Sequence, residues 1–239
     1  MNVLILAASR QAATMRDGDY PSCLTEVDGV PLIERLVTSC APLAASRHIV
    51  ALRAEDAQRF HLDSVISILV PNPAIVRAPG ETAGAACSAL LAIGEIGADE
   101  ELLILSSNEL LDVDFGAVVA SFRQRGLDAG VITFPSIHPR YSYVRLGNDG
   151  HVAEAAEKKP ISRNAVASFF WFARGSDFVN GARNMIRKDA HVEGRFFVCP
   201  VLNELILDQR KVGVYPLDAR AYHPLKTERQ MDYYETMKP

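Results

Sequence analysis

Short apolar runs, rich in β-branched residues, alternate with helix-period segments along the first half of the chain. The runs at 2–8, 48–53 and 102–106 have the length and composition of buried strands. Between them, the segments 31–40 and 82–93 repeat apolar residues every three or four positions, as helices do when one face packs on a sheet. This alternation predicts an α/β fold with a mainly parallel central sheet flanked by helices.

Local signals mark the starts of two helices. Pro31 suits the first turn of the helix at 31–40, because an N–H at that position would have no partner within the helix. Asp114 can cap the N-terminus of a further helix with its side-chain oxygen. We expect the buried faces of these helices to carry Leu32, Ile33, Leu36, Val37 and Cys40, and Phe115, Val118, Val119 and Phe122.

After an apolar run at 129–134 the pattern changes to antiparallel structure. Extended stretches at 141–146 and 151–160 are joined by the sequence Gly-Asn-Asp-Gly, which predicts a β-hairpin inserted into the parallel base. Further predicted elements are a strand at 167–173 with Trp171 in the core, helices at 177–188 and 199–209, and a strand at 211–217. No repeat or flexible linker divides the chain, so we expect one domain over 1–239.

Composition and charge narrow the classes of function. The 239-residue chain is 49% hydrophobic and carries a formal net charge of −4, so it offers no general attraction to the phosphates of nucleic acid. No apolar stretch reaches the length of a membrane span. The four cysteines lie far apart without zinc-ligand spacing, which suits reduced thiols. We expect a cytoplasmic protein without nucleic-acid or membrane partners; the sequence carries no signal for an oligomeric state.

Five stretches, in their order along the chain, carry a family resemblance: 1–8, 20–37, 81–92, 102–110 and 156–165. Together they resemble the nucleotidyltransferases that join a sugar phosphate, or a related phosphorylated small molecule, to a nucleoside triphosphate. The resemblance implies a Rossmann-like nucleotidyltransferase fold. It places the nucleotide side of the domain in residues 1–134 and the sugar-phosphate side, with the antiparallel hairpin, in residues 135–239.

The catalytic motifs of that family are altered in this chain. The phosphate-binding loop of the family resembles GxGxR, but here Ser9 and Gln11 stand at the glycine positions and Ala13 at the arginine position. The family's Pro-Lys pair becomes Pro21-Ser22, and a hydroxyl cannot replace an ammonium. By resemblance, the loop would still bind nucleotide through Ala8, Ser9 and Arg10, although an ordinary surface loop is the equal alternative.

The metal-binding aspartate of the family corresponds to Asn108. An amide oxygen can ligate Mg²⁺ but supplies no charge, and the attraction between opposite charges is the larger contribution to such a site. Near the C-terminus, no acid precedes Thr227, and Lys226 occupies a glycine position of the family's GT motif. Its ammonium could replace the missing metal charge beside a phosphate, or Lys226 could be an ordinary solvated surface lysine.

The binding motifs are closer to the family pattern. Thr82, Gly84 and Ala85 could let a nucleobase or ribose pack against a helix start, or could serve a close contact between helix and sheet. Glu157 and Lys158 match sugar and phosphate contacts of the family, with a solvated hairpin end as the alternative. Ser168 stands where a glycine near the sugar is expected. Arg140 is a candidate phosphate or sugar contact beside the hairpin, or it forms a rim ion pair.

Three hypotheses about function follow. The first is a nucleotidyltransferase-like protein that binds a nucleotide or sugar nucleotide, in surface-polysaccharide or nucleotide-sugar metabolism, with weak or absent transfer activity. The second is an active nucleotidyltransferase that uses Mg²⁺ and non-standard residues drawn from Arg10, Arg16, Lys226, Glu109, Asp112 and Asp114. The third is a non-catalytic scaffold or regulatory subunit of an active homologue. A resident cofactor is expected only under the second.

Overall fold

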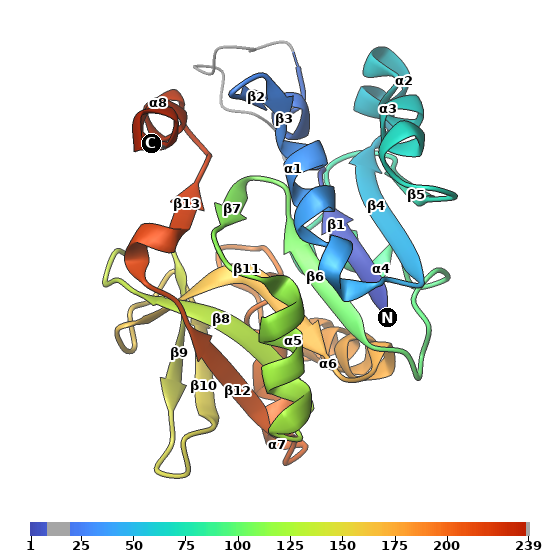
Figure 1. The fold of residues 1–239 in the computed structure, drawn as a ribbon. Helices are drawn as coiled ribbons and strands as arrows, with labels where there is room; N and C mark the ends of the chain where they lie inside the picture. Colours follow the sequence, from blue (N-terminus) through green and yellow to red (C-terminus); the bar gives the residue numbers. More distant parts are fainter. Residues whose placement is uncertain (9–19, 238–239) are drawn as a thin grey trace.

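A nine-stranded mixed sheet runs through the computed structural model, which describes residues 1–8 and 20–237 (Figure 1). One half of the sheet is parallel, in the order β5-β4-β1-β6. Its strands are β1 (Asn2–Leu6), β4 (Arg47–Arg53), β5 (Ala74–Ala78) and β6 (Leu102–Ser106). The predicted α/β fold with a mainly parallel base is therefore confirmed.

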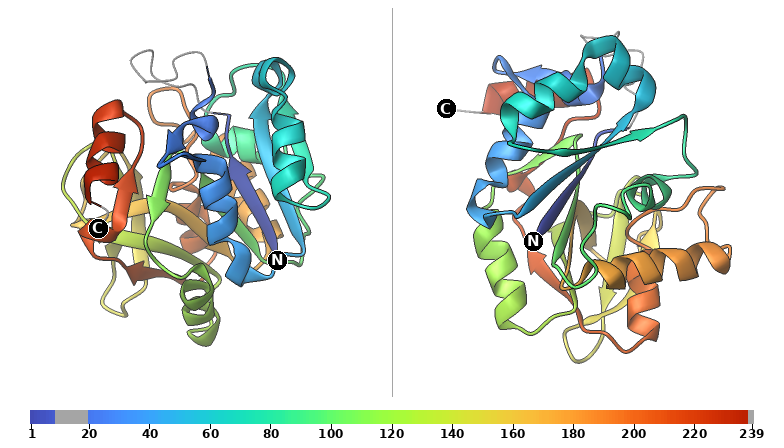
Figure 2. Two further views of the ribbon diagram at one scale, coloured as in Figure 1. Left: turned by 45° about the horizontal axis from the view of Figure 1, so that its top comes forward. Right: turned by 90° about the vertical axis from the view of Figure 1, so that its right-hand side faces the viewer.

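Apolar residues of the central strands are buried on both faces of the sheet. In β1, Val3 and Ile5 join one core cluster while Leu4 joins the other, because successive side chains of a strand point to opposite faces. Figure 2 shows α1 (Leu32–Ser39) and α5 (Phe115–Gln124) on the first face. The opposite face is covered by α4 (Ala85–Leu90), α6 (Gly175–Arg187) and α7 (Val201–Leu207).

The other half of the sheet is organised around one long strand, β11 (Asn164–Phe172). The second part of β11 pairs antiparallel with β6, while its first part pairs with β9 beyond the end of β6. The register shifts between Val166 and Phe170, at the point where the partner strand changes. The remaining strands of this half are β8 (Ala129–Pro135), β9 (Ser142–Leu146), β10 (Val152–Glu157) and β12 (Val212–Pro216). The antiparallel β9–β10 hairpin was predicted.

Two predicted helices are shorter than expected. The segment 82–93 is helical only over α4, and the helix begins after Gly84 because the left-handed φ of +118° at that residue does not fit an α-helix. The segment 199–209 is helical only over α7. The cap at Asp114 is confirmed, since its Oδ1 accepts hydrogen bonds from the N–H groups of Gly116 (2.8 Å) and Ala117 (3.3 Å). Trp171 is buried, as predicted.

Several elements were not predicted from the sequence. They are α2 (Ala54–Phe60), α3 (Leu62–Leu69), the edge strand β5, the short strands β2 (Glu26–Val27), β3 (Val30–Pro31), β7 (Glu109–Leu111) and β13 (Tyr222–Pro224), the helix α8 (Glu228–Met237), and the 3₁₀ turns η1 (Ser22–Leu24), η2 (Ala41–Leu43) and η3 (Ala219–Ala221). Strand β7 directly follows the turn after β6 and pairs antiparallel with β13. This pairing brings the C-terminal part of the chain to the end of β6.

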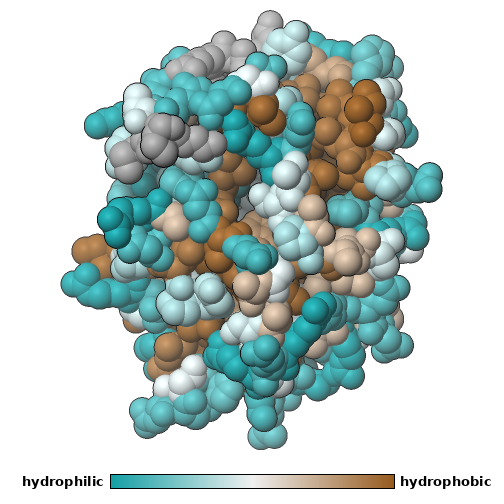
Figure 3. Space-filling model, viewed as in Figure 1, coloured by the Kyte–Doolittle hydropathy of each residue, from teal (hydrophilic) through white to brown (hydrophobic). Residues whose placement is uncertain are grey.

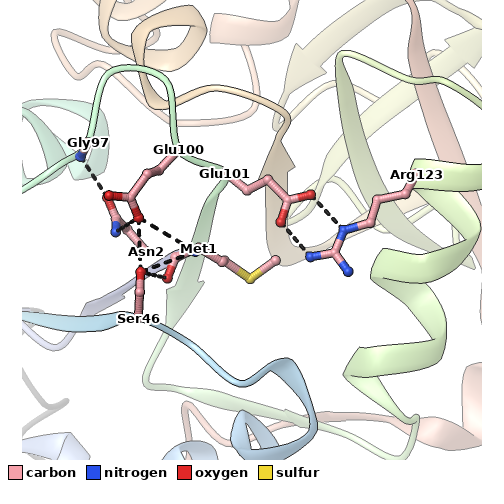
Figure 4. Close-up of polar contacts among 7 residues, drawn as sticks. All are labelled: Met1, Asn2, Ser46, Gly97, Glu100, Glu101 and Arg123. Carbon is pink, nitrogen blue, oxygen red and sulfur yellow. Dashed lines mark hydrogen bonds and ion pairs between the residues drawn. The ribbon is translucent and has the colours of Figure 1, made fainter.

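A cluster of polar side chains holds the N-terminal end of β1, on the side of the sheet away from the carboxyl ends of the parallel strands (Figure 4). The buried Asn2 accepts a hydrogen bond from the N–H of Gly97 (2.6 Å) and donates one to Glu100 (3.0 Å). Ser46 donates to the same Glu100 carboxylate (2.9 Å). These contacts hold β1 against the loop that leads into β6, so the two strands end side by side.

The surface seen in Figure 3 is mostly hydrophilic, with apolar side chains gathered in patches, one of them near α3. Ile68 of α3 is 84% exposed. Among the described residues, no helix combines the length and the apolar character that a membrane crossing requires. The four cysteines are free thiols, and burial raises the pKa of Cys23 and of Cys40 to about 12.

Candidate functional site

A cavity of about 520 Å³ opens where the parallel strands end. The first wall is formed by the carboxyl ends of the parallel strands and by the start of α4, and the second by the hairpin strands and β11. Ligands of open α/β sheets bind at this edge, where the strands of the sheet stop. The lining includes Ala8, Thr82, Gly84, Ala85, Asn108, Arg140, Glu157, Ser168 and Lys226, which the sequence had singled out.

Asn108 lies in the turn between β6 and β7. Its side-chain Oδ1 accepts a hydrogen bond from the hydroxyl of Ser106 (3.0 Å), and its backbone carbonyl accepts one from the N–H of Leu225 (2.9 Å). The amide is half-buried and lines the cavity. Asn108, which the resemblance matches with a metal-binding acid, thus presents a neutral amide to the cavity at the end of β6.

Glu109, the next residue, is a buried carboxylate at the cavity floor, only 5% exposed. One carboxylate oxygen accepts a hydrogen bond from the backbone N–H of Ser168, and the other accepts one from the hydroxyl of Tyr222 (3.1 Å). Burial raises the pKa of this carboxyl above its usual range, and the positive charge of Lys226 opposes the rise. Glu109 thus ties three segments together beneath the cavity.

Lys226 follows β13 and lines the same cavity. Pro224 pairs with Glu109 across the β7–β13 ladder, and the N–H of Leu225 bonds the Asn108 carbonyl, so the backbone itself carries Lys226 to the end of β6. The residue is also exposed, as a surface lysine would be. Within the described part of the chain, it forms no ion pair.

Glu157 and Lys158 end the hairpin but point to different places. Glu157 lines the cavity and accepts a hydrogen bond from the Ser142 hydroxyl. Burial raises its pKa, against the opposing charges of Lys158 and Lys226. Lys158 has a left-handed φ of +55° and lies outside the cavity lining, where its ammonium bonds Glu193 (2.6 Å). The ammonium also lies 5.5 Å from the ring centre of Phe197, which lines the cavity.

Arg140 and Arg195 contribute positive charge to the cavity lining. Arg140 lies over the ring of Tyr141, with 4.7 Å from its guanidinium carbon to the ring centre. Among described residues Arg140 forms no ion pair, so the rim ion pair considered as its alternative is not formed there. Arg195 was not a candidate from the sequence, yet it lines the cavity next to Phe197. No motif in the sequence marks it, because it reaches the site through a turn.

The start of α4 is shaped by a close approach of another chain segment. The N–H of Phe196 donates to the Ala83 carbonyl (2.7 Å), and the N–H of Ala86 donates to the Phe196 carbonyl (3.0 Å). A Cβ on Gly84 would lie 2.3 Å from the Phe196 carbonyl oxygen. Gly84 is therefore required by packing of the chain itself, one of its two sequence interpretations, although it also lines the cavity with Thr82.

The remaining candidates lie elsewhere. Ser22 is buried in η1, only 5% exposed, and does not belong to the described cavity lining. Ser9 and Arg10, like Gln11, Ala13 and Arg16, lie outside the described residues. Asp112 pairs with His223 (2.7 Å) and Asp114 caps α5, so neither carboxylate faces the cavity.

Comparison with known proteins identifies the family. The family model described as "Nucleotidyl transferase" matches residues 19–189. The chain belongs to the nucleotidyl transferase family. No curated protein matches its sequence significantly. A similar solved structure is the nucleoside-diphosphate-sugar pyrophosphorylase from Vibrio cholerae RC9, with a TM-score of 0.81, 16% sequence identity, and alignment over 99% of this chain and 100% of the other. At this identity the likeness concerns the fold, and the Rossmann-like nucleotidyltransferase fold is confirmed.

A nucleotidyl transferase of this type is expected to hold Mg²⁺ with carboxylates near the end of β6, and the residues present do not fit that ion. Both oxygens of Glu109 accept hydrogen bonds within the protein, and Asn108 contributes no charge. Across residues 1–8 and 20–237, no group of three or more His, Cys, Asp and Glu side chains is arranged to hold a metal. Hard cations such as Mg²⁺ prefer charged oxygen ligands, and the carboxylates of Glu109 and Glu157 in the cavity lining are already engaged by Ser168, Tyr222 and Ser142.

Proposed function

We propose that this nucleotidyl transferase family member binds a nucleotide or a sugar nucleotide in the cavity, with little or no transfer activity. The role would belong to nucleotide-sugar metabolism or surface-polysaccharide synthesis. The observation that carries the proposal is the end of β6, where a neutral amide at Asn108 and a fully hydrogen-bonded Glu109 replace an accessible pair of carboxylates.

The cavity supports binding. Its volume of about 520 Å³ lies within the roughly 300–1,000 Å³ typical of small-molecule sites. It combines apolar surface from Leu6, Ile104 and Phe170 with cationic side chains from Arg140 and Lys226. Apolar surface suits a base or sugar face, while the cations suit phosphate oxygens.

The chemistry of transfer has weaker support. Departure of pyrophosphate needs positive charge fixed where negative charge develops, and removal of a single such group commonly costs roughly 10²- to 10³-fold in rate. The family's phosphate lysine corresponds to Ser22, a buried hydroxyl outside the described lining. Its metal acid corresponds to Asn108. Two such losses together would leave turnover close to background.

Calorimetric titration tests the binding half of the proposal. The panel comprises nucleoside triphosphates, sugar 1-phosphates and nucleoside diphosphate sugars of each common base, with and without MgCl₂. We expect at least one nucleotide or nucleoside diphosphate sugar to bind. Silence across the panel would refute the proposed function.

Pyrophosphate release tests the other half. Mixtures of each triphosphate with each sugar 1-phosphate are expected to release pyrophosphate no faster than mixtures without protein. Rapid, MgCl₂-dependent release with any pair would instead show an active transferase.

A further inference from the structure

The position of Lys226 is fixed by backbone contacts on both sides of the residue. Before it, β13 pairs with β7, and the N–H of Leu225 bonds the carbonyl of Asn108 (2.9 Å). After it, α8 begins at Glu228, and the N–H of Lys226 itself donates to the side chain of Gln230 (2.9 Å). The lysine is therefore placed beside the turn that ends β6 and is not carried on a long free loop.

The charges around Lys226 leave its ammonium available to a ligand. Glu109 and Glu157 line the same cavity, and both carboxylates interact with its charge. Neither lies within ion-pair distance of it, since no described residue forms an ion pair with Lys226. The Glu109 oxygens are satisfied by Ser168 and Tyr222, and Glu157 is bonded by Ser142. The carboxylates thus hold a cation near the cavity without neutralising it by direct contact.

Asn108 and Lys226 both make this part of the cavity more positive than the pattern of the family would. An amide in place of an acid removes a negative charge that would attract a metal ion. A lysine in the adjoining segment adds a positive charge, and an ammonium binds phosphate oxygens as a point charge. Together they turn a corner suited to a metal and a phosphate into one suited to a phosphate alone.

We propose that the Lys226 ammonium contacts a phosphate group of the bound nucleotide or sugar nucleotide, so that the protein binds this ligand without a divalent metal ion. The inference rests on the proposed function, because it names the group that holds the phosphates in that site. Lys226 acts here as a binding residue.

The test uses the tightest-binding compound of the calorimetric panel and its parent nucleoside. Wild-type protein is expected to bind the phosphorylated compound equally well in EDTA and in MgCl₂. Lys226→Met should weaken that binding by roughly 10- to 100-fold, the effect of one hydrogen bond to a charged group. Lys226→Arg, which keeps the charge, should recover most of the loss. Binding of the parent nucleoside should not change.

Lys211→Met is the matched control, because Lys211 is exposed and lies outside the cavity lining. Thermal unfolding of each variant separates lost binding from lost folding, and a poorly folded Lys226→Met is replaced by Lys226→Gln. Binding that requires MgCl₂, or equal binding by wild type and the folded Lys226→Met or Lys226→Gln variant, would overturn this inference alone. A panel without any ligand would overturn the proposed function and this inference with it.

Discussion

The hydroxyl of Tyr222 donates a hydrogen bond to a carboxylate oxygen of Glu109 over 3.1 Å, between residues 113 positions apart in the chain. Both residues are buried, and the Tyr222 ring stacks on Phe134 with centroids 3.9 Å apart. The floor of the cavity therefore forms only when the C-terminal segment has folded back onto the end of β6.

Replacing Tyr222 with phenylalanine tests this contact. Tyr222→Phe keeps the ring but removes the donor, and it leaves one oxygen of a buried carboxylate without a partner. The free energy of unfolding should fall by about 1–3 kcal/mol. Urea denaturation followed by circular dichroism measures the change. Tyr233→Phe is the control, since Tyr233 is 62% exposed and its variant should stay within about 0.5 kcal/mol of wild type.

The titration of Glu109 predicts a pH dependence of stability. Burial raises its pKa in the folded protein above the usual value of 4.5, so the folded state holds this proton more tightly than the unfolded state. Its contribution to stability is present below pH 4.5 and is lost as the pH rises through the raised pKa. Wild-type stability should accordingly carry a component that declines from mildly acidic to neutral pH.

Glu109→Gln removes this titration and should flatten the profile, leaving the decline due to Glu157, whose pKa burial also raises. Urea denaturation across the pH range measures both profiles. Glu26→Gln, at an exposed site, should follow the wild-type curve. Parallel profiles for wild type and Glu109→Gln would show that Glu109 does not titrate in this way.

The close approach at α4 predicts a strong effect of a single methyl group. Gly84→Ala places a Cβ against the Phe196 backbone at a left-handed φ, and both effects strain the folded state. We expect a loss of at least about 2 kcal/mol, visible as a lower melting temperature. Gly80→Ala is a control in the same cavity wall, because a Cβ there meets no atom within 4 Å. Equal melting temperatures for the two variants would contradict the packing requirement.

Restoring a carboxylate at position 108 while removing the Lys226 ammonium should make a bound Mg²⁺, in place of the lysine, the positive charge that holds the phosphate. In the double variant Asn108→Asp/Lys226→Ala, a carboxylate can attract Mg²⁺ and no ammonium competes with it. Binding of the phosphorylated ligand should then become stronger in MgCl₂ than in EDTA. Lys226→Ala alone should bind weakly in both. Calorimetry in the two buffers checks this, and equal affinities for the double variant would speak against an exchange.

The sequence revealed many elements whose apolar residues follow a regular spacing, although it missed α3, where Leu62, Ile66 and Leu69 have such a spacing. It also missed elements that depend on distant partners. Strand β6 and helix α5 were recognised because their apolar faces and the Asp114 cap are local signals. Helix α8 escaped recognition because its sequence, ERQMDYYETM, is largely polar. The β7–β13 ladder joins short segments that carry no individual strand signal. Only the folded chain shows that they pair.

The same limit applies to the site. The positions of Asn108 and Lys226 at one cavity could be inferred from motif order, which follows the chain through the fold. The direction of Lys158 could not, because it depends on a left-handed φ and on Glu193. Glu109 entered only as one of several acids, since its hydrogen bonds come from β11 and β13. Burial of Ser22 is likewise a product of packing.

The shared strand β11 has a consequence for how this scaffold diversifies. One part of this nine-residue strand pairs with β6 and the other part pairs with β9, so a single strand sets the distance between the parallel base and the hairpin. Insertions in the turn at 147–150, at the far tip of the hairpin, would leave the pairing of β11 with β6 and β9 unchanged. Proteins with this fold can therefore differ in the length of the hairpin tip and still keep the same distance between the two walls of the cavity.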